Sequence, residues 1–250
     1  MLSKLFLIGL IVVSSCGQSA KKSATPPLED TTPTVTEIDS AKIPNLLPTT
    51  YYIPQEKNIS CSGKYGSGSH VYTADEKTAI IGLKDEVISV VCSRFYKFLL
   101  MEGSAILKNE QSINYGGIKE DGQRRFYVLD RCIFGEGTRR NLCLLPYHTL
   151  AADNKVHKIN DIIFIPKVRG LRLPDGSIHE GYFIVRDTGG AFTGVGAQRV
   201  DMFTGIESDS DNVFLKAGFD RRNPMPAFKI SGLTAEIVRQ NLKDRFGEMY

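Results

Sequence analysis

Three aspartates in the second half of the chain lie next to strongly hydrophobic segments, where acidic side chains are unusual. Asp153 follows a short apolar segment, Asp187 opens an Asp-Thr-Gly-Gly sequence, and Asp201 lies between Val200 and Met202. A carboxylate among apolar side chains costs free energy unless it is exposed, paired or used. Apolar neighbours and a second nearby carboxylate both raise a carboxyl pKa, so that the group can donate and accept a proton near neutral pH. These residues are therefore candidates for general acid–base chemistry.

Two of the three positions also have an ordinary explanation. Asp-Thr-Gly-Gly at residues 187–190 is by itself most often a tight turn, because Asp and Gly serve turns in any protein. Asp153 with Asn154 is a common loop pair. Asp201 is harder to explain in this way, since it falls inside an apolar strand.

The elements that must position these aspartates are mostly strands. Runs of β-branched and aromatic residues predict strands at residues 104–107, 125–129, 161–165, 181–186, 198–202 and 213–217. Such runs without intervening helices predict a mainly β fold with a small closed barrel. Apolar residues at helical spacing predict two amphipathic helices, one at residues 84–101 before the strands and one at residues 234–245 after them.

The N-terminus has the composition of a secretory signal peptide. In residues 1–15, Lys4 is followed by an apolar run over residues 5–13. This run is about half of the roughly 20 apolar residues that a membrane-spanning helix needs. Ser14-Ser15-Cys16 resembles the lipobox of bacterial lipoproteins, which implies cleavage before Cys16 and acylation of that residue. The alternative is an ordinary signal peptide with an incidental cysteine. Gly17 at the next position favours the outer membrane, facing the periplasm.

The rest of the chain divides by composition. Residues 16–50 are rich in Ser, Thr, Pro, Lys and acidic residues, which predicts a disordered, lipid-anchored tether. We expect an accessory segment with a helix at residues 51–103. We expect the barrel domain at residues 104–250, with its core motif at residues 151–205.

Charge argues against one class of partner. The formal net charge is +3 and no concentrated basic stripe is present, so nucleic acid is not an expected partner. We expect the protein to be a monomer that contacts a membrane only through its lipid anchor.

The cysteines predict disulfides. Cys61, Cys92, Cys132 and Cys143 remain beside Cys16, and an even set in an exported protein is typical of disulfides. Of the three possible pairings we favour Cys132 with Cys143, which would close a short Gly- and Arg-rich loop, and Cys61 with Cys92. No Cys-x-x-Cys or His-Glu-x-x-His pattern is present, and the histidines are far apart in the sequence. We therefore expect neither a metal nor another cofactor.

Three sequence blocks resemble the 3D domain, a family named for its three aspartates. The blocks are Ala151-Ala152-Asp153 ahead of a strand ending in Ile165-Pro166, Asp187-Thr188-Gly189-Gly190-Ala191-Phe192-Thr193-Gly194, and Arg199-Val200-Asp201-Met202-Phe203. They follow the family order of Ala-x-Asp, Asp-x-Gly-Gly-Ala-Ile-x-Gly and Arg-x-Asp-x-Phe. The family includes MltA-type lytic transglycosylases and related cell-wall proteins. The resemblance implies a six-stranded double-psi β-barrel.

The resemblance also implies a reaction and a role for each residue. A lytic transglycosylase cleaves the β-1,4 bond between N-acetylmuramic acid and N-acetylglucosamine and forms 1,6-anhydro-N-acetylmuramic acid. Asp201 would be the acid and base, kept protonated by its apolar neighbours and by Asp187. Asp187 would shape the site and bind sugar, and Asp153 would position substrate at the mouth of a groove. Thr188, Gly189 and Gly190 would offer backbone N–H groups to sugar oxygens.

The sequence departs from the family pattern in several places. Lys158 and Asn160 stand where Pro and Gly are usual in a turn, although Asn tolerates the left-handed conformation that such a turn needs. The loop between Asp187 and Asp201 is longer than in the MltA enzymes. No block of suitable length interrupts the predicted barrel, so the second domain that embraces substrate in those enzymes is expected to be missing.

These departures leave two further possibilities open. One is a peptidoglycan-binding or structural envelope lipoprotein that uses the same groove without catalysis. The other is a protein-interaction module, which would fit the tether but would explain none of the aspartates.

Overall fold

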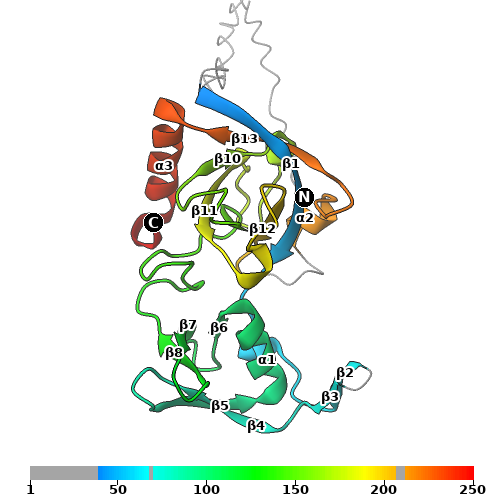
Figure 1. Cartoon of the computed structure of the whole chain (residues 1–250), viewed down its shortest axis with the longest axis vertical. Helices are drawn as coiled ribbons and strands as arrows, with labels where there is room; N and C mark the ends of the chain where they lie inside the picture. The colour runs from blue at the N-terminus through cyan, green and yellow to red at the C-terminus, as the bar shows by residue number, and fades with distance from the viewer. Residues whose placement is uncertain (1–38, 68–69, 207–211) are drawn as a thin grey trace, which may run out of the picture. The chain divides into compact units, whose positions relative to one another are not determined.

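A closed barrel is the central element of the fold (Figure 1). The computed structural model describes residues 39–67, 70–206 and 212–250. Six strands of these described residues close the barrel in the order β1-β12-β9-β11-β10-β13. Their bounds are Ser40–Tyr51 (β1), Thr149–Ala152 (β9), Ile162–Phe164 (β10), Tyr182–Asp187 (β11), Arg199–Phe203 (β12) and Met225–Ile230 (β13). The predicted mainly β fold with a six-stranded barrel is confirmed.

The barrel interior is filled by alternate residues of its strands. Every barrel strand contributes a side chain to one buried cluster, which includes Leu46, Leu150, Ile163, Val185, Val200, Met202 and Ala227. The outer face of β10, β11 and β13 packs instead against α3 (Gly232–Phe246), through residues such as Ile184, Ile230 and Val238. The predicted C-terminal helix at residues 234–245 is thereby confirmed.

The predicted tether is wrong at its C-terminal end, because residues 40–50 belong to strand β1. Residues 40–46 of β1 pair with β13, and residues 47–51 pair with β12. Each half of the strand thus has one hydrogen-bonded neighbour, so that Pro44 and Pro48 can lie where no backbone donor is needed. Leu46 is fully buried at the register shift between the two halves. The segment was predicted to be disordered because its composition is polar. The strand that it forms contributes few large side chains to the core.

The barrel also does not begin at residue 104, because a separate lobe lies between β1 and β9 in the sequence (Figure 1). The lobe contains β2 (Lys64–Ser67), β3 (His70–Thr73), β4 (Lys77–Ile81), β5 (Val87–Cys92), α1 (Ser93–Glu102), β6 (Ser104–Ile106), β7 (Ser112–Ile118) and β8 (Arg124–Val128). Strands β2 and β3 pair with each other, as do β4 and β5, and β6-β7-β8 form a third sheet. The expectation that no second domain interrupts the barrel is therefore wrong. It failed because β1 was not recognised as the first barrel strand.

Two predicted elements change type. The helix expected at residues 84–101 is strand β5 followed by α1, because residues 87–91 are rich in β-branched Val and Ile and pair with β4. The strand expected at residues 213–217 is the short helix α2 (Val213–Lys216). The Asn212 side chain caps α2 by accepting a hydrogen bond from the Leu215 N–H at 2.8 Å.

Short 3-10 helices complete the described structure at Glu56–Asn58, Pro166–Val168, Gly190–Phe192 and Gly247–Met249. The favoured disulfides, Cys61–Cys92 and Cys132–Cys143, are both present. Asn160 has a φ of 72°, the left-handed conformation expected for its turn. The signal peptide, Cys16 and the tether up to residue 38 lie outside the described residues. Within the described ranges no helix has the length and hydrophobicity needed to cross a bilayer.

Candidate functional site

Strand register brings two of the three aspartates into one row. Asp201 on β12 pairs with Ala151 on β9, and Ala151 pairs with Asp187 on β11 after a register shift. Thr49 on β1 pairs with Asp201 from the other side. Paired residues of neighbouring strands project to the same face of a sheet, and neighbouring strands lie about 4.8 Å apart. Asp187 and Asp201 are therefore separated by one strand, on which only a methyl side chain stands between them.

This row lies on the outside of the barrel. Val200 and Met202, on either side of Asp201, belong to the interior cluster, so alternation along β12 turns Asp201 outward. The apolar neighbours that were expected to desolvate Asp201 thus point away from its carboxylate. Asp201 instead forms an ion pair with Arg199, whose Nη2 lies 3.4 Å from Oδ1. The Asp201 side chain is 19% exposed.

Asp187 has the altered protonation behaviour that was expected of Asp201. Burial raises the pKa of Asp187 to about 6, and the negative charge of Asp201 adds to the increase. Two hydrogen bonds oppose this change by stabilising the carboxylate: the Thr188 N–H donates to Oδ1 at 2.8 Å, and the Tyr51 hydroxyl donates to Oδ2 at 3.2 Å. Asp187 can therefore bind or release a proton close to neutral pH.

Tyr51 is a site residue that the sequence did not reveal. It ends β1, and its ring packs on Phe203 with 4.9 Å between centroids. Burial raises the pKa of the Tyr51 hydroxyl well above its usual value, and the charges of Asp187, Asp201 and Glu102 raise it further. The hydroxyl therefore stays protonated and donates to Asp187. No motif marks Tyr51, because it directly follows the segment that had been assigned to the tether.

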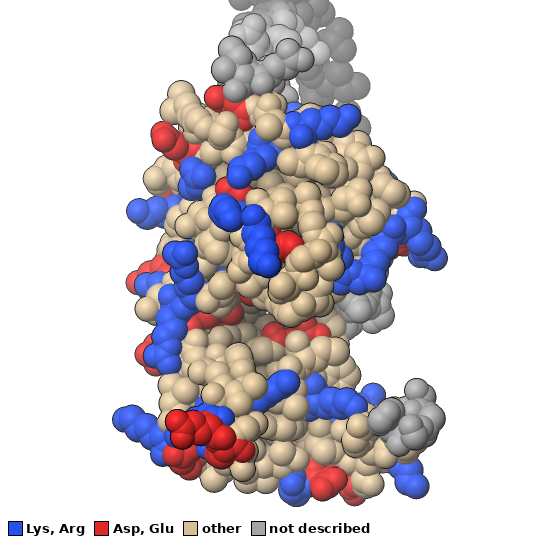
Figure 2. Space-filling view, in the orientation of Figure 1, with Lys and Arg blue, Asp and Glu red and all other residues tan. Residues whose placement is uncertain are grey.

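A cavity of about 430 Å³ adjoins Asp187 and extends to the lobe. Asp187 and Thr188 form its barrel side, while Glu102 at the end of α1 and Glu136 after β8 are on its lobe side. Figure 2 shows the surface hollowed between the barrel and the lobe, with acidic side chains at the edge of the hollow.

Glu136 is held in a fixed position in this cavity. It is 9% exposed. It accepts a hydrogen bond from the Tyr127 hydroxyl at 2.5 Å and one from the Asn141 N–H at 2.8 Å. The disulfide Cys132–Cys143 closes the loop that carries it. A rigid carboxylate thus faces the cavity from the lobe.

Of the three aspartates only Asp187 lines this cavity; Asp201 lies one strand away in the same row, and Asp153 belongs neither to the row nor to the cavity lining. It is 2% exposed, and its carboxylate accepts hydrogen bonds from the backbone N–H groups of Lys155 (3.0 Å), Gly194 (2.9 Å) and Gly196 (3.3 Å). These hydrogen bonds, with that from Lys155 foremost, lower the pKa of Asp153. His157 holds the same loop through the Ala197 carbonyl at 2.9 Å. Asp153 therefore braces the loop between Asp187 and Asp201, and the expected position at the mouth of the groove is not supported.

The turn after Asp187 only partly fits its expected role. Thr188 lines the cavity, but its N–H is directed to Asp187. Gly189 has an extended backbone. A Cβ added at this position would lie 3.6 Å from the Phe192 side chain, which is an ordinary van der Waals distance. A Cβ at Gly190 would meet no atom within 4 Å, so this glycine leaves open space beside the site.

Within residues 39–67, 70–206 and 212–250, no group of three or more His, Cys, Asp or Glu side chains is arranged to hold a metal ion. The chemistry available to the described site is proton transfer by carboxyl groups and hydrogen bonding to a polar ligand.

Comparisons with known proteins give several solved structures that match this chain at low sequence identity. The membrane-bound lytic murein transglycosylase of Agrobacterium tumefaciens is 16% identical, with 84% of this chain and 79% of that chain covered and a TM-score of 0.45. MltA of E. coli with bound chitohexaose is 12% identical, with 75% and 71% covered and a TM-score of 0.42. MltA of Neisseria gonorrhoeae is 12% identical, with 77% and 72% covered and a TM-score of 0.40.

A search of curated protein sequences found no match. The model of the 3D domain family matches residues 148–219, which span β9 to α2 and include all three aspartates. Residues 148–219 of this chain are therefore similar to the 3D domain family.

Proposed function

We propose that this protein is a peptidoglycan lytic transglycosylase that cleaves the β-1,4 bond between N-acetylmuramic acid and N-acetylglucosamine. The observation that carries the proposal is the pair of carboxylates, Asp187 and Asp201, in one outward-facing row whose Asp187 end lines a cavity. A pKa of about 6 for Asp187 means that the pair can hold one proton near neutral pH.

The chemistry needs one group that first gives and then takes a proton. In our proposal Asp201, the third aspartate of the motif, protonates the glycosidic oxygen as the bond to C1 of N-acetylmuramic acid breaks. The C6 hydroxyl of the same sugar then attacks C1, and Asp201 takes the proton of that hydroxyl. The product is the 1,6-anhydro sugar, and no water is consumed. Because the nucleophile belongs to the substrate, holding both reacting atoms in one geometry supplies much of the acceleration.

Asp187 and Tyr51 support this cycle by their charge and position. Asp187 lies one strand from Asp201 in the same row, and the Arg199 guanidinium forms an ion pair with Asp201. We assign Asp187 to shaping the site and binding sugar, with Tyr51 fixing its orientation. Gly190 leaves room for a sugar to approach the turn.

The location belongs to the same proposal. Signal cleavage before Cys16, acylation of that residue and attachment to the outer membrane would place the 3D domain in the periplasm, where peptidoglycan lies. A lipid anchor with several acyl chains gives stable attachment. Mass measurement of the processed N-terminal peptide would test the modification of Cys16.

The decisive experiment is mass spectrometry of the soluble products after purified protein is incubated with purified peptidoglycan. We expect 1,6-anhydro products from the wild type and at least a hundredfold loss in Asp201→Asn, as is usual when a general acid is removed. Asp130→Asn, which changes an exposed aspartate of the lobe, is the matched control.

The second candidate, a wall-binding protein without catalysis, is favoured by one observation. The Arg199 guanidinium stabilises the ionised form of Asp201 and so opposes its role as an acid. Sedimentation of the wild type with peptidoglycan but without any anhydro product would select this binding function and reject the enzyme.

A further inference from the structure

A second cavity continues the candidate groove along α1. It has a volume of about 530 Å³ and shares Leu100, Met101 and Arg124 with the cavity beside Asp187. A ligand lying against Asp187 and Glu102 would therefore meet this second cavity without leaving the surface. The remaining lining residues are Tyr65, Arg94, Lys97 and Phe98.

The lining of the second cavity carries positive charge only. Arg94, Lys97 and Arg124 line it together with apolar and aromatic side chains, and no Asp or Glu does. None of these three cations forms an ion pair with a carboxylate of the described residues. This contrasts with Arg125, the next residue on β8, which is paired with both Asp85 and Asp121. The cavity thus has positive charge that the fold leaves uncompensated.

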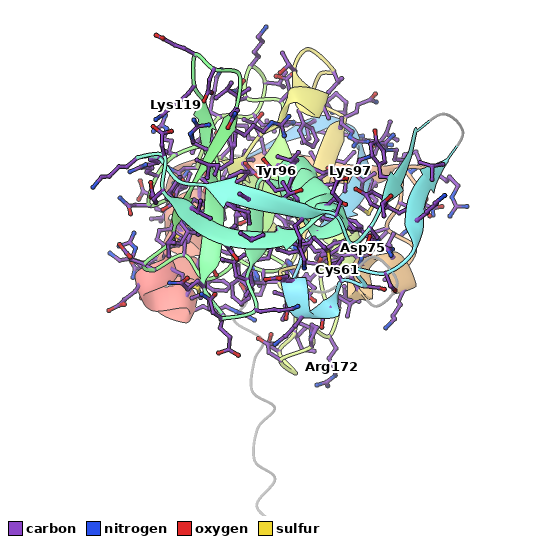
Figure 3. The ribbon with its side chains drawn as sticks, turned by 90° about the horizontal axis from the view of Figure 1, so that it is seen from below. Cys61, Asp75, Tyr96, Lys97, Lys119 and Arg172 are labelled. Atoms are coloured by element: carbon purple, nitrogen blue, oxygen red, sulfur yellow. A yellow bond between two sulfur atoms is a disulfide. The ribbon has the colours of Figure 1, made fainter. Side chains whose placement is uncertain are left out.

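All three cations have contacts that hold them, and Arg94 donates from Nη1 to the Ser60 carbonyl at 3.4 Å. Arg124 donates from Nη1 to the Leu100 carbonyl at 3.0 Å, and a guanidinium has further N–H donors to offer a ligand. Lys97 Nζ lies 3.8 Å from the centre of the Tyr72 ring and 5.5 Å from that of Tyr65, and these two rings stack. Figure 3 shows Lys97 on the side of α1 that faces the β2–β3 hairpin.

The apolar part of the cavity is unusually exposed. Met101 is 68% exposed at the boundary between the two cavities, whereas Phe95 and Leu99 of the same helix are fully buried. An exposed large apolar side chain beside unpaired cations is typical of a surface that binds an amphipathic ligand.

We propose that this second cavity binds the acidic peptide that peptidoglycan carries on its muramic acid residues. The proposal rests on the proposed function, because the glycan in the first cavity brings the peptide to the second. Carboxylates of the peptide bind Arg94, Lys97 and Arg124, and its aliphatic side chains pack on Met101 and Phe98. The protein therefore prefers glycan strands that still carry peptides over bare strands.

The test compares two pools of purified glycan strands, one with its peptides and one from which an amidase has removed them. Binding is measured by isothermal titration calorimetry in the Asp201→Asn background, so that neither pool is cleaved. We expect the peptide-bearing pool to bind roughly tenfold more tightly, as two or three partly exposed ion pairs provide. Arg94→Gln/Lys97→Gln should remove this preference, and higher salt should reduce it. Lys57→Gln/Lys84→Gln removes the same charge from lobe residues that line neither cavity and should preserve the preference.

Two outcomes overturn the proposal in distinguishable ways. Equal binding of the two pools, or an equal loss for both pools in Arg94→Gln/Lys97→Gln, rejects the peptide site and leaves the glycan site intact. Failure of both pools to bind rejects the peptide site together with the proposed function.

Discussion

At the scale of single residues, Asp187 and Asp201 hold different positions in the same row. Asp187 has the raised pKa and accepts two hydrogen bonds, while Asp201 faces Arg199. The sequence identified both residues, because the motif blocks mark them. It assigned the raised pKa to Asp201 from its neighbours along the strand, but in a strand those neighbours point to the opposite face.

Asp187 should lower the stability of the protein at neutral pH. Its folded pKa, about 6, is above the usual 3.8, so the folded state holds the proton more tightly than the unfolded chain. The penalty is therefore absent below pH 3.8 and develops as pH rises through 6. Asp187→Asn should abolish this pH dependence, so that the free energy of unfolding of the wild type, relative to that of the variant, falls by about 2 kcal/mol between pH 3.5 and pH 7. Urea unfolding of both proteins at the two pH values measures this, and an unchanged difference between them would contradict it.

Tyr51 should set the pH dependence of activity through Asp187. Tyr51→Phe removes a hydrogen bond that lowers the Asp187 pKa, so this pKa should rise. If the reaction needs one proton on the carboxylate pair, activity falls as pH increases past the pKa, and the fall should move to higher pH in Tyr51→Phe. Rates of anhydro-product formation between pH 5 and 8 would show it. A lower rate with an unchanged pH profile would mean that Tyr51 contributes only packing on Phe203.

At the scale of elements, the site depends on one loop between β11 and β12. Asp153 and His157 hold this loop from the segment after β9. Asp153, the first aspartate of the motif, thus acts on the loop that separates the other two. A sequence pattern can show that three carboxylates belong together, but it cannot distinguish a carboxylate that contacts ligand from one that is saturated by backbone N–H groups.

Asp153→Asn should loosen this loop. The amide that replaces one carboxylate oxygen cannot accept from a backbone N–H, so a buried donor is left unsatisfied at a cost of about 1 to 3 kcal/mol. We expect lower stability in urea and faster hydrogen exchange at the Gly194 and Gly196 amides, with Asp130→Asn as the unaffected control. Unchanged exchange at both glycine amides would argue against a bracing role.

Several elements could be predicted because the pattern of residues along the chain favours the same secondary structure that the folded protein contains. Strand β10 and the first four residues of β11 are apolar runs, β12 alternates polar and apolar residues, and α3 has apolar residues on one face. Residues 87–92 were assigned to a helix because their apolar positions also fit helical spacing, although the β-branched residues favour a strand. Strand β1 gave no signal because its stability comes from partners that are distant in sequence.

At the scale of the whole chain, the boundary of the folded part is testable. A chain that begins at Asp39 retains β1, whereas a chain that begins at Tyr52 leaves β12 and β13 each without one neighbour. We expect the first to unfold cooperatively and the second to lose its cooperative transition, because unpaired backbone groups and the loss of Leu46 open the barrel. Circular dichroism during heating compares them. A cooperative transition at the same temperature in both would show that β1 is dispensable.

The lobe would act together with the barrel in this arrangement. Glu102 and Glu136 reach the cavity from elements that are encoded between the first and second barrel strands. The sequence predicted a barrel with no second domain. In the structure, residues of the inserted lobe line the side of the cavity that lies opposite the barrel. Under the proposed function, changes in the lobe would alter contacts with substrate while residues 148–219 stay the same.

The pairing of β1 with β12 and β13 also determines when the barrel can close during folding. Pro48 lies beside Val200, and Ser40 lies beside Ile230, so the earliest strand finds no neighbour until the final part of the polypeptide is present. Contacts between such distant positions form slowly, since a long loop must first be closed. A nascent chain would thus remain open while it is synthesised, and assembly of the barrel would be the last event of folding.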